Sequence, residues 1–269
     1  MNEDPDASAK RDSAVSLDRA RGALLDHLPK ELILARYQAA GGQEVLTGKF
    51  ASPESSAALV ANAFGFFLNV PELLSLPEPS VAAGSVSEVL LETQMRFPWS
   101  GGYHPWLDVV VETPDSLIGI ESKRYEPFRD TKSVEFSDAY ARPVWGDNMR
   151  PFEALRRALL NGESRFQFLD AAQLVKHAFG LRTQATKRNK GAFLVYLYAE
   201  PVTYPDGRPI QAADKTAHRR EVSVFAAAVG SADVQFQSLR YADLLSNWER
   251  SSNYAVREHT VAIRGRFDV

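Results

Sequence analysis

Two carboxylates and a lysine interrupt neighbouring apolar segments near the middle of this 269-residue chain. Asp108 lies within the apolar segment 106–112, and the next apolar segment ends on Glu121-Ser122-Lys123. Mg²⁺ takes oxygen ligands in proteins and binds through only one or two carboxylates. The sequence therefore predicts a magnesium site, with Mn²⁺ as a substitute. Asp108 and Glu121 are its expected ligands, and the Ser122 carbonyl is a third oxygen.

Two short strands joined by a turn would bring these side chains together. Residues 106–112 and 117–123 each read as a strand, and Pro114-Asp115 between them is typical of a β-turn. Side chains alternate along a strand, so Glu121 and Lys123 share a face, and pairing as a hairpin places Asp108 beside them. Lys123 would then hold a water and offset the negative charge that develops on a phosphate during hydrolysis.

A structural interpretation of the same residues is a cross-strand salt bridge on an edge hairpin. The acid-x-Lys pattern is weak by itself, because Asp130-Thr131-Lys132 repeats it in a segment with no strand before it. The strands on both sides of the turn are what distinguish Glu121-Ser122-Lys123 from that second copy.

The composition, 45% apolar and 24% charged, is ordinary for a globular protein. The net charge of −3 gives no overall attraction to nucleic acid, so such binding needs local basic patches. The absence of cysteine excludes disulfides, thiolate metal sites and a cysteine nucleophile. No apolar run approaches the roughly 18 residues of a membrane span, and the acidic start is unlike a signal peptide. We expect no membrane partner and a cytoplasmic location, and leave a homo-oligomer open.

The rest of the chain predicts a single α/β domain over residues 17–269, preceded by a flexible tail over residues 1–16. It has a helical extension at its N-terminal end and a basic C-terminal segment. Predicted helices cover residues 17–38 (split at Pro29), 53–70, 151–161, 164–181, 212–229 and 241–248. Predicted strands cover residues 84–97, 106–112, 117–123, 192–199 and 234–239. This order predicts a mixed sheet, part hairpin and part crossover, flanked by helices.

A capped helix, a strand with Asp108, a turn, and an apolar strand ending in Glu-x-Lys together resemble the PD-(D/E)XK nuclease superfamily, the restriction-endonuclease-like fold. Gly119-Ile120-Glu121-Ser122-Lys123 is similar to the third-strand signature of that superfamily, and the resemblance covers residues 53–239. It implies an αβββαβ core and divalent-metal-dependent cleavage of nucleic acid, with Asp108, Glu121 and Lys123 as catalytic residues. The chain departs from the pattern at Leu107, where the superfamily has proline.

The upstream acidic residue of the superfamily has three candidates here: Glu54, Glu88 and Glu92. We favour Glu92 as a further catalytic residue. It lies on the polar face of the strand before Asp108, where it would help to orient a metal-bound water.

Polar and basic residues after the hairpin are the candidates for contacts with nucleic acid. Gln173 resembles the polar residue that several superfamily members carry on the helix after the third strand. His177 next to Lys176 is in reach of a phosphate, although a solvated pair at a helix end is the commoner case. The candidates are Gln173, Lys176, Arg182, Lys187, Arg188 and Lys190; for the basic loop 182–190 a solvated turn is the alternative.

Two classes of function follow. The first is a Mg²⁺-dependent nuclease, for which we expect DNA as the substrate, although the sequence does not separate DNA from RNA. The second is a catalytically inactive PD-(D/E)XK-like module that binds nucleic acid or a protein partner. The complete set of Asp108, Glu121 and Lys123 favours the nuclease, whereas the unsettled upstream acid favours the inactive module.

Overall fold

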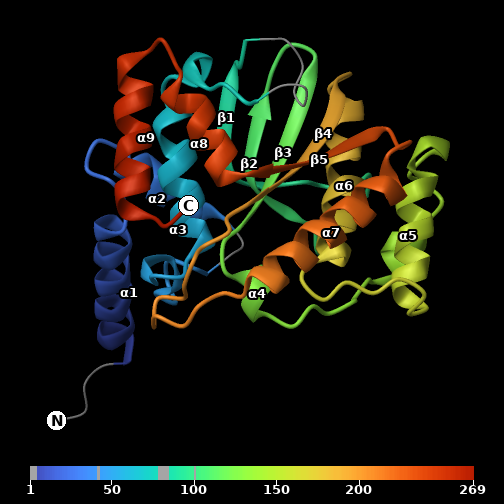
Figure 1. Ribbon diagram of the computed structural model, residues 1–269, viewed down its shortest axis with the longest axis horizontal. Helices are drawn as coiled ribbons and strands as arrows, with labels where there is room; N and C mark the ends of the chain where they lie inside the picture. Colours follow the sequence, from blue (N-terminus) through green and yellow to red (C-terminus); the bar gives the residue numbers. More distant parts are fainter. Residues whose placement is uncertain (1–4, 41–42, 78–84, 100) are drawn as a thin grey trace.

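A mixed sheet lies at the centre of the computed structural model, which describes residues 5–40, 43–77, 85–99 and 101–269 (Figure 1). Its strands lie side by side in chain order: β1 (Glu88–Gln94), β2 (Trp106–Glu112), β3 (Ser116–Lys123), β4 (Gly191–Tyr198) and β5 (Val234–Arg240). β1, β2 and β3 are antiparallel neighbours, whereas β3, β4 and β5 run parallel. The predicted α/β fold with a mixed sheet, part hairpin and part crossover, is confirmed.

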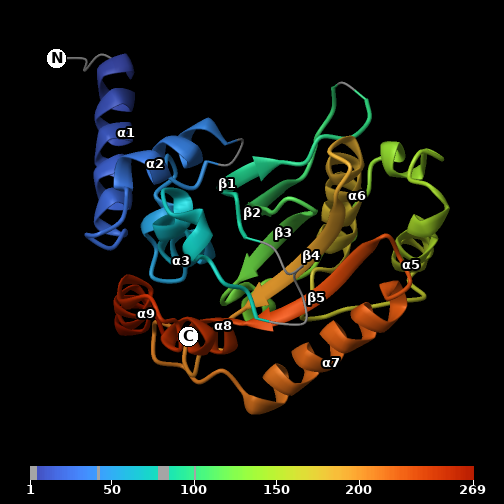
Figure 2. The same ribbon diagram turned by 90° about the horizontal axis from the view of Figure 1, so that it is seen from above.

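Helices cover both faces of this sheet (Figure 2). On one side lie α1 (Pro5–Gly22), α2 (Lys30–Ala39), α3 (Ser56–Gly65), α8 (Tyr241–Glu249) and α9 (Tyr254–Arg266). On the other side lie α5 (Arg150–Leu160), α6 (Ala171–Lys187) and α7 (Ala212–Val229). The connections contain α4 (Glu126–Arg129) and the 3₁₀ turns Lys49–Ala51, Phe66–Leu68, Pro71–Leu73, Asp138–Ala141 and Asp147–Met149. None of the helices in the described residues is long and apolar enough to span a membrane.

Two hydrophobic cores result, one on each face of the sheet. The central strands β3 and β4 are apolar along most of their length, as strands covered on both faces must be. In β2 the alternation of side chains is interrupted at Asp108. Val109 and Val111 belong to the core under α3, whereas Leu107 and Val110 belong to the core under α6. The side chains of β2 therefore switch between the two faces of the sheet at Asp108.

The two ends of the chain differ from the sequence prediction. Residues 5–16 belong to helix α1, where a flexible tail was predicted, and the prediction for residues 1–4 lies outside the described residues. The basic C-terminal segment, for which no element was predicted, forms α9. Its N-terminus is capped by Asn253, whose side chain accepts hydrogen bonds from the backbone N–H groups of Ala255 and Val256.

Two internal helices begin later than predicted, because different residues cap them. α3 begins at Ser56, since the Ser55 side chain, and not that of Ser52, accepts the hydrogen bond from Ala58 N (3.0 Å). α6 begins at Ala171 because Asp170 caps it, and it continues to Lys187. The basic loop predicted over residues 182–190 is therefore mostly the last turns of a helix.

Candidate active site

The pairing of β2 with β3 ends where the predicted carboxylates begin. The last pair of this ladder joins Val109 to Ile120, and Asp108 and Glu121, the next residues in register, do not pair. Instead, Ser122 N donates a hydrogen bond of 2.6 Å to the Asp108 side chain. The two strands thus separate at this edge of the sheet, and the opening is occupied by acidic side chains.

Glu92 of β1 faces the same opening. It lies between the β1–β2 pairs Leu91–Val109 and Thr93–Leu107, so that it stands across from Asp108 without pairing to it. Its φ of 48° lies in the left-handed region, which residues other than glycine adopt only rarely. The backbone irregularities of β1 and β2 therefore coincide at the two carboxylates, as backbone strain often does at functional sites.

Leu107, where the superfamily has proline, contributes to this local structure. A Cβ at Gly119 of β3 would lie 2.4 Å from Leu107 Cδ1, so the leucine fills the space that the glycine leaves. The sequence difference at residue 107 is thus accommodated by packing inside the hairpin, and Asp108 keeps its place at the opening.

Glu121 is held between two basic side chains. Lys123 Nζ lies 2.6 Å from its Oε1 and His177 Nε2 lies 3.0 Å from its Oε2, while the Glu121 side chain is only 3% exposed. Burial alone would raise the pKa of Glu121, but Lys123 and His177 lower it to about 2. Burial likewise works to lower the pKa of Lys123, but Glu121 outweighs it and the pKa is raised. Both groups are therefore charged at neutral pH, and Lys123 is no proton acceptor.

His177 reaches Glu121 because α6 approaches the sheet closely. A Cβ at Gly180 would lie 2.6 Å from Met95 Cβ and 2.9 Å from Met95 O, so any larger residue would push the helix away. Gly180 lies three residues beyond His177, on the same side of the helix. This glycine therefore allows α6 to pack closely against Met95, the residue directly after β1.

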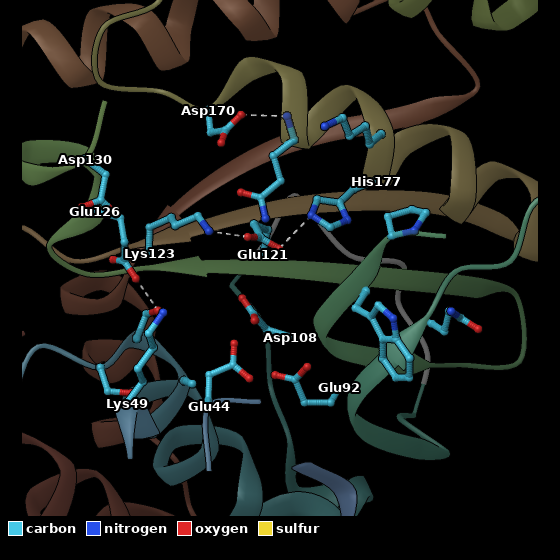
Figure 3. A pocket seen from close by; sticks show the side chains of 18 of the residues that line it. Glu44, Lys49, Glu92, Asp108, Glu121, Lys123, Glu126, Asp130, Asp170 and His177 are labelled. Carbon is cyan, nitrogen blue, oxygen red and sulfur yellow. Dashed lines mark hydrogen bonds and ion pairs between the residues drawn. The ribbon is translucent and has the colours of Figure 1, made fainter. Parts of the chain in front are cut away.

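Carboxylates outnumber cations around the opening (Figure 3). Glu44, Glu92, Asp108 and Glu121 line one cavity of about 1080 Å³, and the side chains of Glu44, Glu92 and Asp108 gather on one side of Glu121. Burial, together with Glu44 and Glu121, raises the pKa of Glu92 to about 8. Burial, Glu121 and Glu92 raise the pKa of Asp108 well above its usual range. Adding a cation here would relieve this repulsion.

The chemistry of these donors fits a hard divalent cation. Asp108, Glu121 and Glu92 offer carboxylate oxygens, the ligands that Mg²⁺ and Mn²⁺ prefer. Within the described residues, no group of three or more His, Asp or Glu side chains is already arranged to hold a metal ion. Both oxygens of Glu121 contact Lys123 or His177, so an ion bound by Glu121 would have to displace one of these contacts.

The structure separates the three candidates for the upstream acid. Glu92 lies at the opening. Glu54 also lines the cavity, but it forms an ion pair with Arg129. Glu88 pairs in register with Glu112, at the opposite end of β1 and β2. Of the three, Glu92 is therefore the carboxylate that stands across from Asp108, and its catalytic role stays a prediction.

The other predicted site residues fall into two groups. Gln173 and Lys176 line the cavity, on the turn of α6 that carries His177. Arg188 and Lys190 instead contact Glu112 at the turn end of the hairpin, and Arg182 contacts Asp233. Neither they nor Lys187 line the cavity. Ser122 does not line it either: its hydroxyl lies 2.7 Å from the Tyr241 hydroxyl, while its N–H binds Asp108.

Sequence reasoning missed two residues of the site. Glu44 lies in a connection without periodicity, so no local pattern placed it near the sheet. His177 was assigned to a solvated helix end, but its side chain is 3% exposed and contacts Glu121. Its position four residues after Gln173 was a usable signal, because residues four apart share a helix face.

The fold and the site together define a restriction-endonuclease-like protein of the PD-(D/E)XK superfamily, a class of nucleases that generally use divalent metal ions. A family comparison agrees with this class. Residues 20–262 match the family described as Restriction Endonuclease associating with ARP, and the chain belongs to this family. The comparisons with curated proteins and with solved structures found no match. The family assignment confirms the predicted resemblance, and it implies a nuclease with nucleic acid as its substrate.

Proposed function

We propose that this protein is a Mg²⁺-dependent endonuclease that hydrolyses phosphodiester bonds of DNA. The observation that carries the proposal is the arrangement of Asp108, Glu121 and Lys123 where β2 and β3 separate, at the floor of a cavity of about 1080 Å³. The structural alternative, a cross-strand salt bridge, would join Asp108 to Lys123. Here Lys123 instead contacts Glu121 of its own strand, the backbone pairing of β2 with β3 ends before both carboxylates, and the pKa of Asp108 is raised.

In this proposal Asp108 and Glu121 hold the metal ion, and Ser122, which does not line the cavity, contributes through its N–H bond to Asp108. When bound, Mg²⁺ supplies a polarised water and neutralises charge on the phosphate. Lys123 stays protonated, so its role is to place an ammonium beside the phosphate as negative charge develops there. Glu92, across from Asp108, orients the water.

The polar face of α6 would hold the substrate strand over this site. Gln173 and Lys176 line the cavity on the turn of α6 that ends at His177. Lys176 offers a positive charge for a phosphate, and Gln173 offers hydrogen bonds that do not depend on charge. His177, buried against Glu121, keeps the orientation of that carboxylate.

Cleavage of supercoiled plasmid and labelled oligonucleotides, in Mg²⁺, Mn²⁺, Ca²⁺ and EDTA, tests the proposal. We expect cutting in Mg²⁺ and Mn²⁺ only, and a loss of about 100-fold or more in the single-turnover rate of Lys123→Ala. Lys215→Ala is the matched control, since Lys215 lies on α7, does not line the cavity and is not a candidate for contact with nucleic acid. Thermal unfolding of each variant checks that it is folded.

Three outcomes would contradict the proposal. Cleavage that persists in EDTA would exclude the metal-dependent mechanism. Equal cleavage by wild type and Lys123→Ala would remove Lys123 from the catalytic site. Binding of DNA without cleavage in any metal would support the inactive binding module.

A further inference from the structure

A second, smaller cavity opens off the main one beside Lys123. Its volume is about 150 Å³, and residues such as Lys123 and Gln173 line both cavities. An apolar cavity of about 150 Å³ in another protein holds one benzene molecule. This side pocket therefore matches one six-membered ring in volume more closely than the fused rings of a purine.

Apolar surfaces form part of its wall. Pro127, Phe168 and Tyr196 line it. Tyr196 is 2% exposed, and its hydroxyl lies 2.9 Å from His218 Nε2, so its ring is fixed behind the wall of the pocket. The backbone N–H of Phe168 donates to the Glu221 carboxylate (2.8 Å), which fixes that residue as well. The rest of the lining is polar or charged, and includes Glu126, Asp130, Lys132 and Asp170. A flat ring placed here would meet apolar surfaces on one part of the wall and charged groups on the other.

Polar groups without partners lie around the same pocket. The side-chain amide of Gln173 and the hydroxyl of Thr131 both line it, and neither makes a hydrogen bond to another described residue. An amide offers a donor and an acceptor side by side, the pattern that pairs with the edge of a nucleobase. Enzymes that take a base out of its stack bind it in this way, between apolar side chains and hydrogen-bonding groups.

We propose that this side pocket binds a single unpaired pyrimidine base of the substrate, which rests on the nuclease function proposed above. Because Lys123 lines both cavities, the base belongs to a nucleotide next to the phosphate that Lys123 contacts. The substrate would then be a single strand, or a duplex from which one pyrimidine is extruded. Extrusion is least costly for an unpaired base.

Binding to short oligonucleotides tests this inference without relying on cleavage. Each probe is a strand of abasic nucleotides with one central cytosine, thymine, adenine or guanine, or with no base. We expect wild type to bind a single pyrimidine about tenfold more tightly than the abasic strand, as base stacking on aromatic side chains suggests. A purine should give little of this gain. Fluorescence anisotropy is measured in Ca²⁺ and again in EDTA.

Filling the pocket should abolish the gain from the base. Thr131 is exposed, so Thr131→Phe adds a ring at the pocket without crowding the core. Ser133→Phe is the matched control, since Ser133 is exposed in the same segment and does not line the pocket. We expect Thr131→Phe to bind all probes like the abasic strand, and Ser133→Phe to behave like wild type.

Gln173→Met gives an independent test, because it removes the polar edge while keeping the length of the side chain. We expect it to reduce the gain from the pyrimidine several-fold. Equal binding of pyrimidine and abasic probes by wild type, or no binding of any probe, overturns the inference. So does a gain that survives in Thr131→Phe, or one as large for purines. If the protein cleaves DNA but binds all probes equally, only the proposal of base binding in the side pocket is refuted. If it prefers a pyrimidine probe but cleaves nothing, only the proposal of nuclease activity is refuted.

Discussion

The two ends of the β2–β3 hairpin carry similar residues in opposite electrostatic situations. At the turn end, Glu112 contacts Arg188 and Lys190, and these two cations outweigh burial and lower its pKa. At the open end, acidic side chains crowd together, and the pKa of both Asp108 and Glu92 is raised. Charge at the turn end thus stabilises the fold, whereas charge at the open end works against it and is consistent with a site for a cation.

The largest effect that this comparison predicts is the response to neutralising Asp108. Asp108→Asn keeps an acceptor for Ser122 N but removes the charge. We expect the single-turnover rate of DNA cleavage to fall by about 10³-fold or more. The free energy of unfolding, measured in urea, should stay the same or rise.

Removing the charge from Glu112 should do the reverse: Glu112→Gln should lose about 1 kcal/mol of stability and keep its rate of DNA cleavage within about twofold of wild type. If Asp108→Asn and Glu112→Gln lose the same free energy of unfolding, the two ends of the hairpin do not differ in their electrostatics.

The second prediction concerns pH in the absence of metal. Glu92 keeps its proton to about pH 8 in the folded protein, against an ordinary pKa of 4.5. Between these values Glu92 keeps its proton in the folded state and loses it in the unfolded state, so its contribution to stability should fall as pH rises from about 5 to 8. The slope from one group is at most about 1.4 kcal/mol per pH unit.

Urea unfolding in EDTA measures this slope. Glu92→Gln should make it shallower, and Mg²⁺ should raise stability most at the high-pH end. Glu121, with its pKa of about 2, acts in the other direction below about pH 4.5, and His218 and His259, whose pKa burial lowers to about 4, act in the other direction up to about pH 6.5. A slope between pH 6.5 and 8 that is the same in wild type and Glu92→Gln would contradict the unfavourable charge at the open end.

The smallest effect is expected at the turn end, from Lys190→Ala. The Lys190 ammonium contacts Glu112 at 2.7 Å and also donates to Thr113 O. We expect a loss of about 1 kcal/mol in the free energy of unfolding and no change in DNA affinity. A clear loss of affinity would instead support the sequence-based assignment of Lys190 to nucleic-acid binding.

The hairpin was predictable because its signals are local. The bounds of β2 and α7 match the prediction, and those of β3 differ by one residue. Alternation and the turn residues decide where these strands lie, and charged residues inside apolar strands indicate the site. The roles of Asp108, Glu121 and Lys123 in catalysis stay predictions.

The start of α6 and the place of Glu44 were not predicted, because both depend on contacts between segments far apart in the chain. The helix predicted from Ser164 begins at Ala171 because the Glu221 carboxylate of α7 accepts hydrogen bonds from Gln167, Phe168 and Leu169 N–H groups. These backbone groups would otherwise be free to start a helix. Glu44 likewise reaches the cavity only through the folding of the N-terminal region.

The left-handed backbone at Glu92 restricts which residues can stand there, whatever their chemistry. Glycine, asparagine and aspartate accept a φ of 48° most readily, and β-branched residues accept it least. In a saturation library at this position, folding yield should rank Gly, Asn and Asp above Val and Ile, while activity should require a carboxylate. Aspartate would then satisfy both requirements, and it is the replacement to expect when this position varies.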